Sequence, residues 1–193
     1  MDKRVFDIFF SVLGILLTSW LLIIFFIAAT IDTRQVGIYT QTRIGRYGNK
    51  FKIYKLRTIC NTSIGEKRIS ALGYFLRRSK IDELPQLYNV LMNTMSFVGP
   101  RPDIKGYYDR LQGTDRRLLE LKPGITGPAS IKYSDEDALL SNMERADLYN
   151  DEVLFPDKVR INLNYLSHQS FRLDIKIIIY TILRKKLEEE YFN

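Results

Sequence analysis

The sequence predicts an α+β fold that is mainly helical, with a small β-hairpin and an N-terminal helix embedded in a membrane. Three observations predict it. Residues 8–31 carry no charged side chain, residues 36–42 and 51–57 are rich in β-branched and aromatic side chains around a turn, and residues 171–187 place apolar side chains at helical spacing. We expect a membrane-embedded helix over residues 1–33 and a folded domain over residues 34–193.

The uncharged N-terminal run is long enough to cross a bilayer. It has 24 residues, from Ile8 to Ile31, and a helix that rises about 1.5 Å per residue covers a hydrocarbon core of about 30 Å with that length. A cleaved signal peptide is the alternative interpretation. Residues 28–30, Ala-Ala-Thr, form a poor cleavage site, and the run is longer than the usual signal-peptide core. The sequence therefore favours a retained membrane helix.

Basic residues flank this run on both sides, with Lys3 and Arg4 before it and Arg34 after it. The positive-inside rule favours the cytoplasm for both flanks, which a simple spanning helix does not allow. We therefore expect a re-entrant helix that enters the membrane and turns back. The candidate positions for the break are Ser11, Gly14, Thr18 and Ser19.

The rest of the chain predicts short elements around irregular loops. Residues 45–49 are a turn-forming stretch between the two strand candidates. Pro85 suits the first position of a helix over residues 85–92, because its fixed φ is pre-organised for a helix. The other expectations are a helix over 72–78, irregular loops over 99–102 and 122–128, and a helix over 171–187 that lies in the core or on the membrane surface.

Charge and composition restrict the kinds of partner that the chain is expected to bind. The net charge is +7, and residues 34–80 hold twelve Lys or Arg against one acid, which suggests an anionic partner. The aromatic residues among these cations alternate as strand residues do, and no nucleic-acid-binding signature is present, so we expect no nucleic acid. With one cysteine, Cys60, and one histidine, His168, an internal disulfide and the common zinc patterns are excluded.

The most suggestive chemical feature is the adjacent pair Asp82 and Glu83, just before Pro85. A helix N-terminus favours anions, so it would keep Asp82 ionised and help to hold a phosphate. A carboxylate can attack phosphorus to give an acyl phosphate, and a neighbouring carboxylate can hold Mg²⁺ together with substrate phosphates. Taken alone, the pair also fits the ordinary decoration of helix N-termini with acids.

Several cations accompany this pair. Arg77, Arg78 and Lys80 precede it directly, and Arg101 lies in the proline-stiffened loop 99–102. Arginine side chains bind phosphate oxygens in bidentate fashion, and phosphoryl transfer depends chiefly on positioning and charge neutralisation. A diphosphate donor would need such cations, although each arginine taken separately suits a surface position equally well.

These residues form motifs that resemble the bacterial sugar transferase family, the small monotopic phosphoglycosyl transferases. The resemblance runs nearly end to end and is most specific where an Asp-Glu-Leu-Pro-Gln motif precedes a Gly-Pro-Arg-Pro motif. The matching segments are residues 3–7, 41–45, 55–58, 82–87, 89–91, 95–102, 122–127, 151–153, 158–160 and 170–176.

The resemblance implies transfer of a phosphosugar from a UDP-sugar to polyprenyl (undecaprenyl) phosphate, with release of UMP. It implies that Asp82 is the nucleophile and that Glu83 binds Mg²⁺. The residues expected to bind substrate phosphates are Arg77, Arg101, Lys55 and Arg57. The reaction would start capsule, exopolysaccharide, O-antigen or glycoprotein glycan assembly.

The resemblance also implies a place in the cell. The expected location is the bacterial inner membrane, with the catalytic domain on its cytoplasmic face and some helices on the membrane surface. A monomer and a homo-oligomer both remain open.

The chain departs from the family pattern at two places. The family usually breaks its membrane helix with a Ser-Pro pair, whereas this chain has Ser19-Trp20 and so lacks the proline kink. After Gly127 it has Pro128-Ala129-Ser130, where the family commonly has a large apolar residue followed by Ala-Gln. Two other functions compete with the transferase. One is an inactive membrane scaffold of the same fold, and the other is an ordinary glycosyltransferase that releases UDP.

Overall fold

The computed structural model describes residues 2–61, 67–141 and 143–187. The chain divides into two compact units. Unit 1 contains residues 1–3, 44–50 and 96–193, and unit 2 contains residues 4–43 and 51–95. Among the described residues, helices dominate both units and three two-stranded sheets accompany them, which confirms the predicted α+β class.

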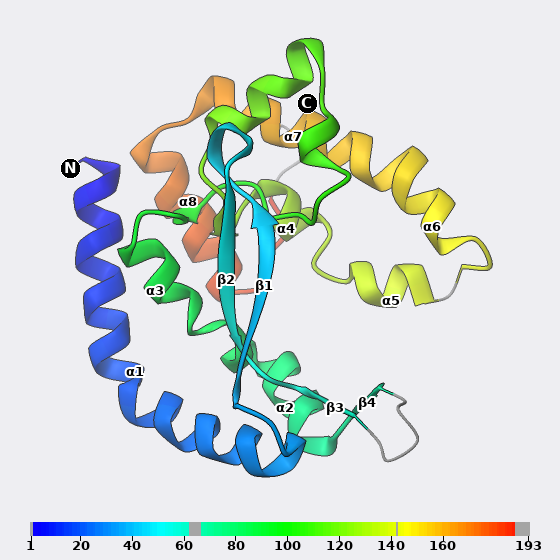
Figure 1. Cartoon of the computed structure of the whole chain (residues 1–193). Helices are drawn as coiled ribbons and strands as arrows, with labels where there is room; N and C mark the ends of the chain where they lie inside the picture. Colours follow the sequence, from blue (N-terminus) through cyan, green and yellow to red (C-terminus); the bar gives the residue numbers. More distant parts are fainter. Residues whose placement is uncertain (1, 62–66, 142, 188–193) are drawn as a thin grey trace. The chain divides into compact units, whose positions relative to one another are not determined.

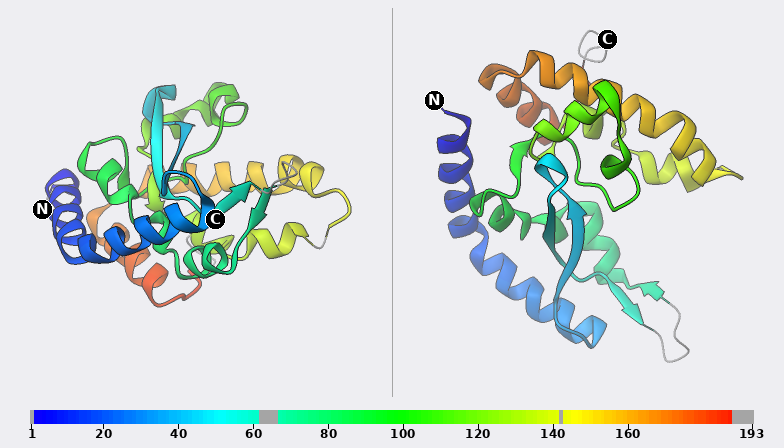
Figure 2. Two further views of the ribbon diagram at one scale, coloured as in Figure 1. Left: turned by 60° about the horizontal axis from the view of Figure 1, so that its bottom comes forward. Right: turned by 45° about the horizontal axis from the view of Figure 1, so that its top comes forward.

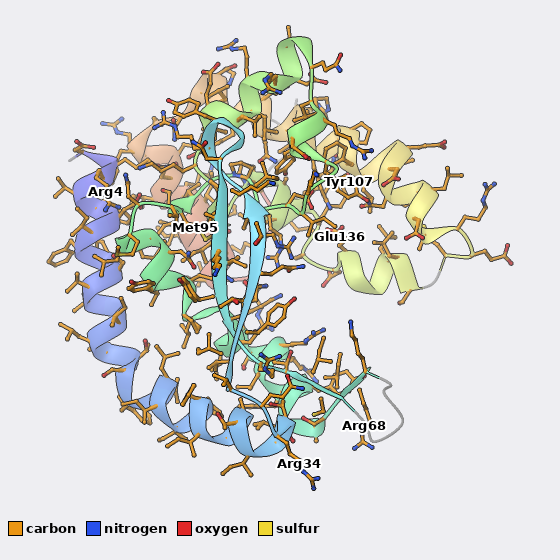
Figure 3. All side chains as sticks on the ribbon, viewed as in Figure 1. Arg4, Arg34, Arg68, Met95, Tyr107 and Glu136 are labelled. Carbon is orange, nitrogen blue, oxygen red and sulfur yellow. The ribbon has the colours of Figure 1, made fainter. Side chains whose placement is uncertain are left out.

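Helix α1 (Lys3–Thr33) confirms the predicted N-terminal apolar helix. The mean hydropathy of its most apolar 18 residues is 2.6, and only 6% of them are buried. It is the one helix in the described part of the chain that is long and apolar enough to cross a membrane. Figure 3 shows side chains projecting along its whole length, with Arg4 near one end and Arg34 just beyond the other. The apolar surface of α1 therefore faces outward.

The expected break in this helix is wrong, because α1 is continuous and bends instead. Figures 1 and 2 show the bend near its middle. Thr18 Oγ1 donates to the carbonyl of Gly14 at 2.7 Å, and Ser19 Oγ donates to the carbonyl of Leu16 at 3.0 Å. Hydroxyls that bond back to the preceding turn often bend helices, so a direction change is compatible with Trp20 in place of proline.

The predicted hairpin is present as β1 (Ile38–Ile44) and β2 (Lys50–Leu56), joined by the 3₁₀ turn η1 (Arg46–Gly48). Tyr47 and Gly48 both have positive φ, which closes the turn. An unpredicted antiparallel pair follows, β3 (Ile59–Asn61) with β4 (Lys67–Ile69). Its strands are too short for an alternation pattern to identify them.

Two helices and a 3₁₀ turn complete unit 2: α2 (Ala71–Ser79), η2 (Ile81–Glu83) and α3 (Gln86–Leu91). Ser70 caps α2, since its hydroxyl accepts a hydrogen bond from the Gly73 N–H. Lys80 ends α2 in the left-handed conformation, with φ of 60°. Helix α3 begins at Gln86, one residue after the predicted start at Pro85, which immediately precedes it.

Unit 1 contains a short parallel pair that the sequence did not predict, β5 (Ser96–Val98) with β6 (Gly124–Thr126). The expectation of an irregular loop over residues 122–128 is therefore wrong. Gly99, which follows β5, allows the two segments to pack closely, because a Cβ at this position would lie 2.1 Å from the carbonyl oxygen of Lys122. The loop over residues 99–102 follows β5 as expected.

The main core of unit 1 lies among β5, α4, α7 and α8, with Ile161 and Ile177 fully buried. Helix α8 ends earlier than residue 187, because Arg184 adopts a positive φ of 52°. The remaining elements of this unit are η3 (Tyr108–Arg110), η4 (Gly113–Glu120), α4 (Pro128–Lys132), α5 (Glu136–Ser141), α6 (Ala146–Tyr149), η5 (Asn150–Leu154), α7 (Phe155–His168) and α8 (Phe171–Ile182).

Candidate active site

The acidic pair occupies the turn η2, between α2 and α3. The turn is tight because the left-handed Lys80 ends α2 and the backbone N–H of Glu83 then donates to the Lys80 carbonyl at 3.2 Å. Pro85 fixes the entry into α3. The sequence thus places Asp82 and Glu83 on a short rigid corner rather than on a flexible loop.

Asp82 is buried although it is a carboxylate. The residue is 6% exposed, and its Oδ1 atom has no hydrogen-bond partner among the residues that the structure describes. Burial and then the neighbouring Glu83 carboxylate raise the pKa of Asp82, against the opposing charges of Lys55, Lys80 and Arg77. A buried polar atom without a partner is costly, so this oxygen is suited to a ligand from outside the chain.

Glu83 is held by a lysine from the hairpin. Lys55 Nζ on β2 lies 2.8 Å from Glu83 Oε1, and the two side chains are 20% and 12% exposed. The positive charge of Lys55 also lowers the pKa of Asp82, so one ammonium group stabilises the ionised form of one carboxylate and pairs with the other. Lys55 was predicted as a phosphate ligand, and the structure places it at the acidic pair.

Arg77 reaches the same site from α2. Its Nε donates to Thr58 Oγ1 at 2.9 Å, which fixes the side chain of an otherwise exposed residue, and its charge lowers the pKa of Asp82. Lys80 also acts on Asp82. Sequence reasoning named Lys80 among the cations that precede the pair but assigned no role to Thr58. The available signals were that Thr58 ends the segment 55–58 and that Lys80 lies two residues before Asp82.

The other two predicted phosphate ligands are Arg57, which follows β2, and Arg101, which belongs to unit 1. The guanidinium of Arg57 donates to the carbonyls of Val36 at 2.8 Å and Ile38 at 3.4 Å and lies over the Tyr39 ring. These contacts hold the start of β1, and the phosphate-binding role of Arg57 stays a prediction. Arg101 follows β5 in unit 1, and its phosphate-binding role stays a prediction.

The acidic pair fits the donor preference of Mg²⁺. This ion usually takes one or two protein carboxylates together with substrate phosphates, and Asp82 and Glu83 are adjacent carboxylates with one buried oxygen unpartnered. In the described part of the chain, no group of three or more His, Cys, Asp and Glu side chains could hold a metal. Any Mg²⁺ at this pair would therefore draw further ligands from substrate or water.

Both ends of α1 are attached to the helices beside the acidic pair. Arg4 donates to the carbonyls of Val90 and Leu91, each at 2.7 Å, and so caps the end of α3. At the other end, Asp32 accepts a hydrogen bond from Ser70, the N-cap of α2, at 2.6 Å. The two ends of the apolar helix thus meet polar elements of the same unit.

Comparison with known proteins decides the family. The family model for bacterial sugar transferases matches residues 1–186. The chain belongs to the bacterial sugar transferase family. This membership confirms the resemblance drawn from the motifs of the sequence.

The relatives carry consistent names. The chain is 39% identical to a putative undecaprenyl-phosphate N-acetylgalactosaminyl 1-phosphate transferase of Bacillus subtilis, over 60% of this chain and 76% of the relative. It is 32% identical to galactosyl transferase CpsE of Streptococcus agalactiae, over 93% of this chain and 41% of the relative. It is also 32% identical to the UDP-glucose:undecaprenyl-phosphate glucose-1-phosphate transferase of Escherichia coli, over 94% of this chain and 39% of the relative. The chain thus spans about two fifths of the length of the latter two.

Proposed function

We propose that this protein transfers a phosphosugar from a UDP-sugar to polyprenyl phosphate and releases UMP. The names of relatives support the reaction class, since they include undecaprenyl-phosphate sugar-phosphate transferases. The structural observation that carries the proposal is the buried Oδ1 of Asp82, which has no hydrogen-bond partner among the described residues and feels the charges of Lys55, Arg77 and Lys80. A nucleophilic carboxylate beside phosphate-binding cations needs this arrangement.

In the proposed first step, a carboxylate oxygen of Asp82 attacks the phosphorus that bears the sugar. The bond from this phosphorus to the bridging oxygen breaks, and the electron pair leaves with UMP. In the second step, an oxygen of polyprenyl phosphate attacks the same phosphorus. The bond to Asp82 breaks, which gives a polyprenyl diphosphate sugar and restores the carboxylate. Neither step changes an oxidation state.

The surrounding residues support these steps electrostatically. Lys55, Arg77 and Lys80 would neutralise the diphosphate and stabilise the negative charge of the transition state, because phosphoryl transfer depends chiefly on positioning and charge. Their charges also favour the ionised form of Asp82 against the effect of burial. Glu83 would hold Mg²⁺, which when bound neutralises charge on the substrate phosphates.

We place the catalytic domain on the cytoplasmic face of the inner membrane, with α1 re-entrant. The attachment of Arg4 to α3 and of Asp32 to the cap of α2 supports this topology, since it keeps both ends of α1 on one polar unit. A straight spanning helix would separate these ends by the thickness of the bilayer.

Helix α2 supports an interfacial position as well. Its exposed face carries Tyr74 and Phe75, at 64% and 52% exposure, with Arg78 one turn further on. Phe75 meets Phe25 of α1 with ring centroids 5.9 Å apart, so this face continues the apolar surface of α1. Aromatic and basic side chains together favour the headgroup region, where a lipid phosphate lies.

The test of topology is cysteine labelling in membranes of intact cells. In a Cys60→Ser background, Asp2→Cys and Val36→Cys introduce thiols on either side of α1. We expect an impermeant reagent outside the inner membrane to label neither. Labelling of only one of them would show that α1 spans the membrane and would contradict the re-entrant topology.

The test of function is nucleotide release in detergent with Mg²⁺ and polyprenyl phosphate. Because relatives are named for galactose, N-acetylgalactosamine and glucose, the panel begins with these three UDP-sugars. We expect UMP from one donor and none from Asp82→Asn. Release of UDP would indicate an ordinary glycosyltransferase. A folded protein that releases no nucleotide with a broad donor panel would favour the inactive scaffold.

A further inference from the structure

Asn89, on α3, makes an unusual set of contacts with the hairpin. The residue is 2% exposed. Its Nδ2 donates to the carbonyl of Lys52 at 2.8 Å, and its Oδ1 accepts a hydrogen bond from the N–H of Tyr54 at 3.2 Å. Nδ2 also lies 3.2 Å from Thr94 Oγ1, to which it donates. One buried amide thus satisfies groups from two other segments.

The two bonds to β2 follow the pattern of a strand edge. One residue of a neighbouring parallel strand would accept from one residue's N–H and donate to the carbonyl two residues before it. The amide of Asn89 supplies this donor and acceptor from a single side chain. Asn89 therefore satisfies the edge of β2 in the manner of one residue of an additional strand.

This attachment joins β2 to α3, and the Lys55–Glu83 ion pair joins β2 to η2, the turn that leads into α3. Lys55 follows Tyr54 directly on β2, and Glu83 lies six residues before Asn89 on the segment that leads into α3. The hydrogen bond from the Tyr54 N–H to the Asn89 side chain therefore fixes the backbone one residue from Lys55. The position of the strand relative to α3 determines whether the ammonium reaches the carboxylate at 2.8 Å.

We propose that Asn89 is a positioning residue for the acidic pair, and that its amide aligns β2 with α3 so that Lys55 lies against Glu83 and beside Asp82. This inference rests on the proposed function of that pair. Asn89 itself touches neither carboxylate in the contacts described above, so its effect on catalysis passes through Lys55.

The test compares Asn89→Asp with Asn162→Asp. The first variant keeps an acceptor for Tyr54 but places a carboxylate oxygen against the Lys52 carbonyl, so the alignment is lost. Asn162 on α7 is a matched control, since it is 1% exposed, belongs to unit 1, and its amide atoms have no partner among the described residues. We expect UMP release to fall roughly 10- to 100-fold in Asn89→Asp. In Asn162→Asp we expect a rate per folded molecule within about twofold of the parent chain.

A double-mutant cycle separates positioning from general destabilisation. If Asn89 acts through Lys55, adding Asn89→Asp to Lys55→Met should lower the remaining rate by less than about twofold. A full additional loss in that background would overturn the proposal, because Asn89 would then act by another route. An unchanged rate in Asn89→Asp alone would overturn it as well.

A structural readout keeps the test independent of the reaction. Hydrogen exchange across residues 51–57 should be faster in Asn89→Asp than in the parent chain, and unchanged in Asn162→Asp. If Asn89→Asp does not fold, Asn89→Ser takes its place in the test. This variant removes both the oxygen and the nitrogen of the amide and should show the same faster exchange. Unaltered exchange in a folded Asn89 variant would contradict the alignment. If the parent chain released no UMP, the proposed function would fail first, and this exchange would still test the alignment.

Discussion

Two buried carboxylates, one in each unit, differ in their hydrogen-bond partners. Asp174 in unit 1 is 3% exposed and fully engaged, with Lys3 Nζ at 2.7 Å and a short hydrogen bond from the Tyr165 hydroxyl. Asp82 in unit 2 is equally buried, yet its Oδ1 has no partner among the described residues. The first arrangement stabilises a fold, whereas the second leaves an oxygen available to a substrate.

A third carboxylate, Asp157, shows how hydrogen-bond partners within the chain change the pKa of an acid. Burial opposes ionisation of Asp157, but hydrogen bonds from Lys132, Tyr133 and Arg160 outweigh it and lower the pKa to about 2. The pKa of Asp82 is raised instead, because burial exceeds the effect of its cations. We conclude that hydrogen-bond partners within the chain separate structural acids from the candidate nucleophile.

The largest expected effect is on turnover when Asp82 changes. Asp82→Asn removes the nucleophile while keeping its size, and UMP release should fall by roughly 10⁴-fold or more. The matched variant Asp174→Asn should retain most of its rate per folded molecule, because Asp174 bonds to structural partners. Equal losses of rate in the two folded variants would remove the distinction drawn here.

A smaller effect is expected from the cations around Asp82. Lys80→Met should lower UMP release roughly 10- to 100-fold, since a charge beside the phosphates is lost. It should also move the acid limb of the pH–rate profile to higher pH, because Lys80 lowers the pKa of Asp82 and its removal lets that pKa rise. Arg78→Met is the control variant, and we expect the acid limb of its pH–rate profile to stay at the same pH as in the parent chain. A shift to lower pH in Lys80→Met would contradict the assignment.

Substitution of the structural acid Asp174 should lower the stability of the fold rather than the rate of UMP release. Asp174→Asn leaves the Lys3 ammonium without its anionic partner, and the free energy of unfolding should fall by roughly 2 kcal/mol. Denaturant titration in detergent, followed by circular dichroism, measures this. A variant as stable as the parent chain would show that the Lys3–Asp174 pair does not hold unit 1 together.

The smallest effect concerns acid stability. Because the folded-state pKa of Asp157 is lowered to about 2, its contribution to stability is present above about pH 4 and is lost as the pH falls toward 2. The stability difference between the parent chain and Asp157→Asn should therefore shrink by roughly 1 kcal/mol between pH 5 and pH 3. A difference that grows over this interval would contradict the lowered pKa.

Sequence patterns predicted the features that depend on neighbouring residues. The apolar run gave α1, the turn between two β-rich segments gave β1 and β2, and the proline after Asp82 and Glu83 placed the pair at the entry to α3. Each of these depends on composition or spacing within about thirty residues. The family resemblance added expected roles for these residues.

Features that depend on distant contacts were not predicted. Lys55 and Glu83 are 28 residues apart, and Thr58 and Arg77 are 19 apart, so no local pattern reveals these contacts. Strands β5 and β6 have three residues each, too few for an alternation to identify them. For a related reason the sequence does not distinguish the two roles of Arg57, because a cation that bonds backbone carbonyls has the same sequence signal as one that binds phosphate.

The central claim is that Asp82 carries the phosphosugar between the two steps. The most direct test is a single-turnover reaction with the accepted UDP-sugar and Mg²⁺ but without polyprenyl phosphate, followed by intact-protein mass spectrometry. We predict a burst of at most one UMP per protein and a mass increase of one phosphosugar, both absent in Asp82→Asn. Release of UMP only when polyprenyl phosphate is present, with no mass increase, would contradict the covalent intermediate and favour direct transfer.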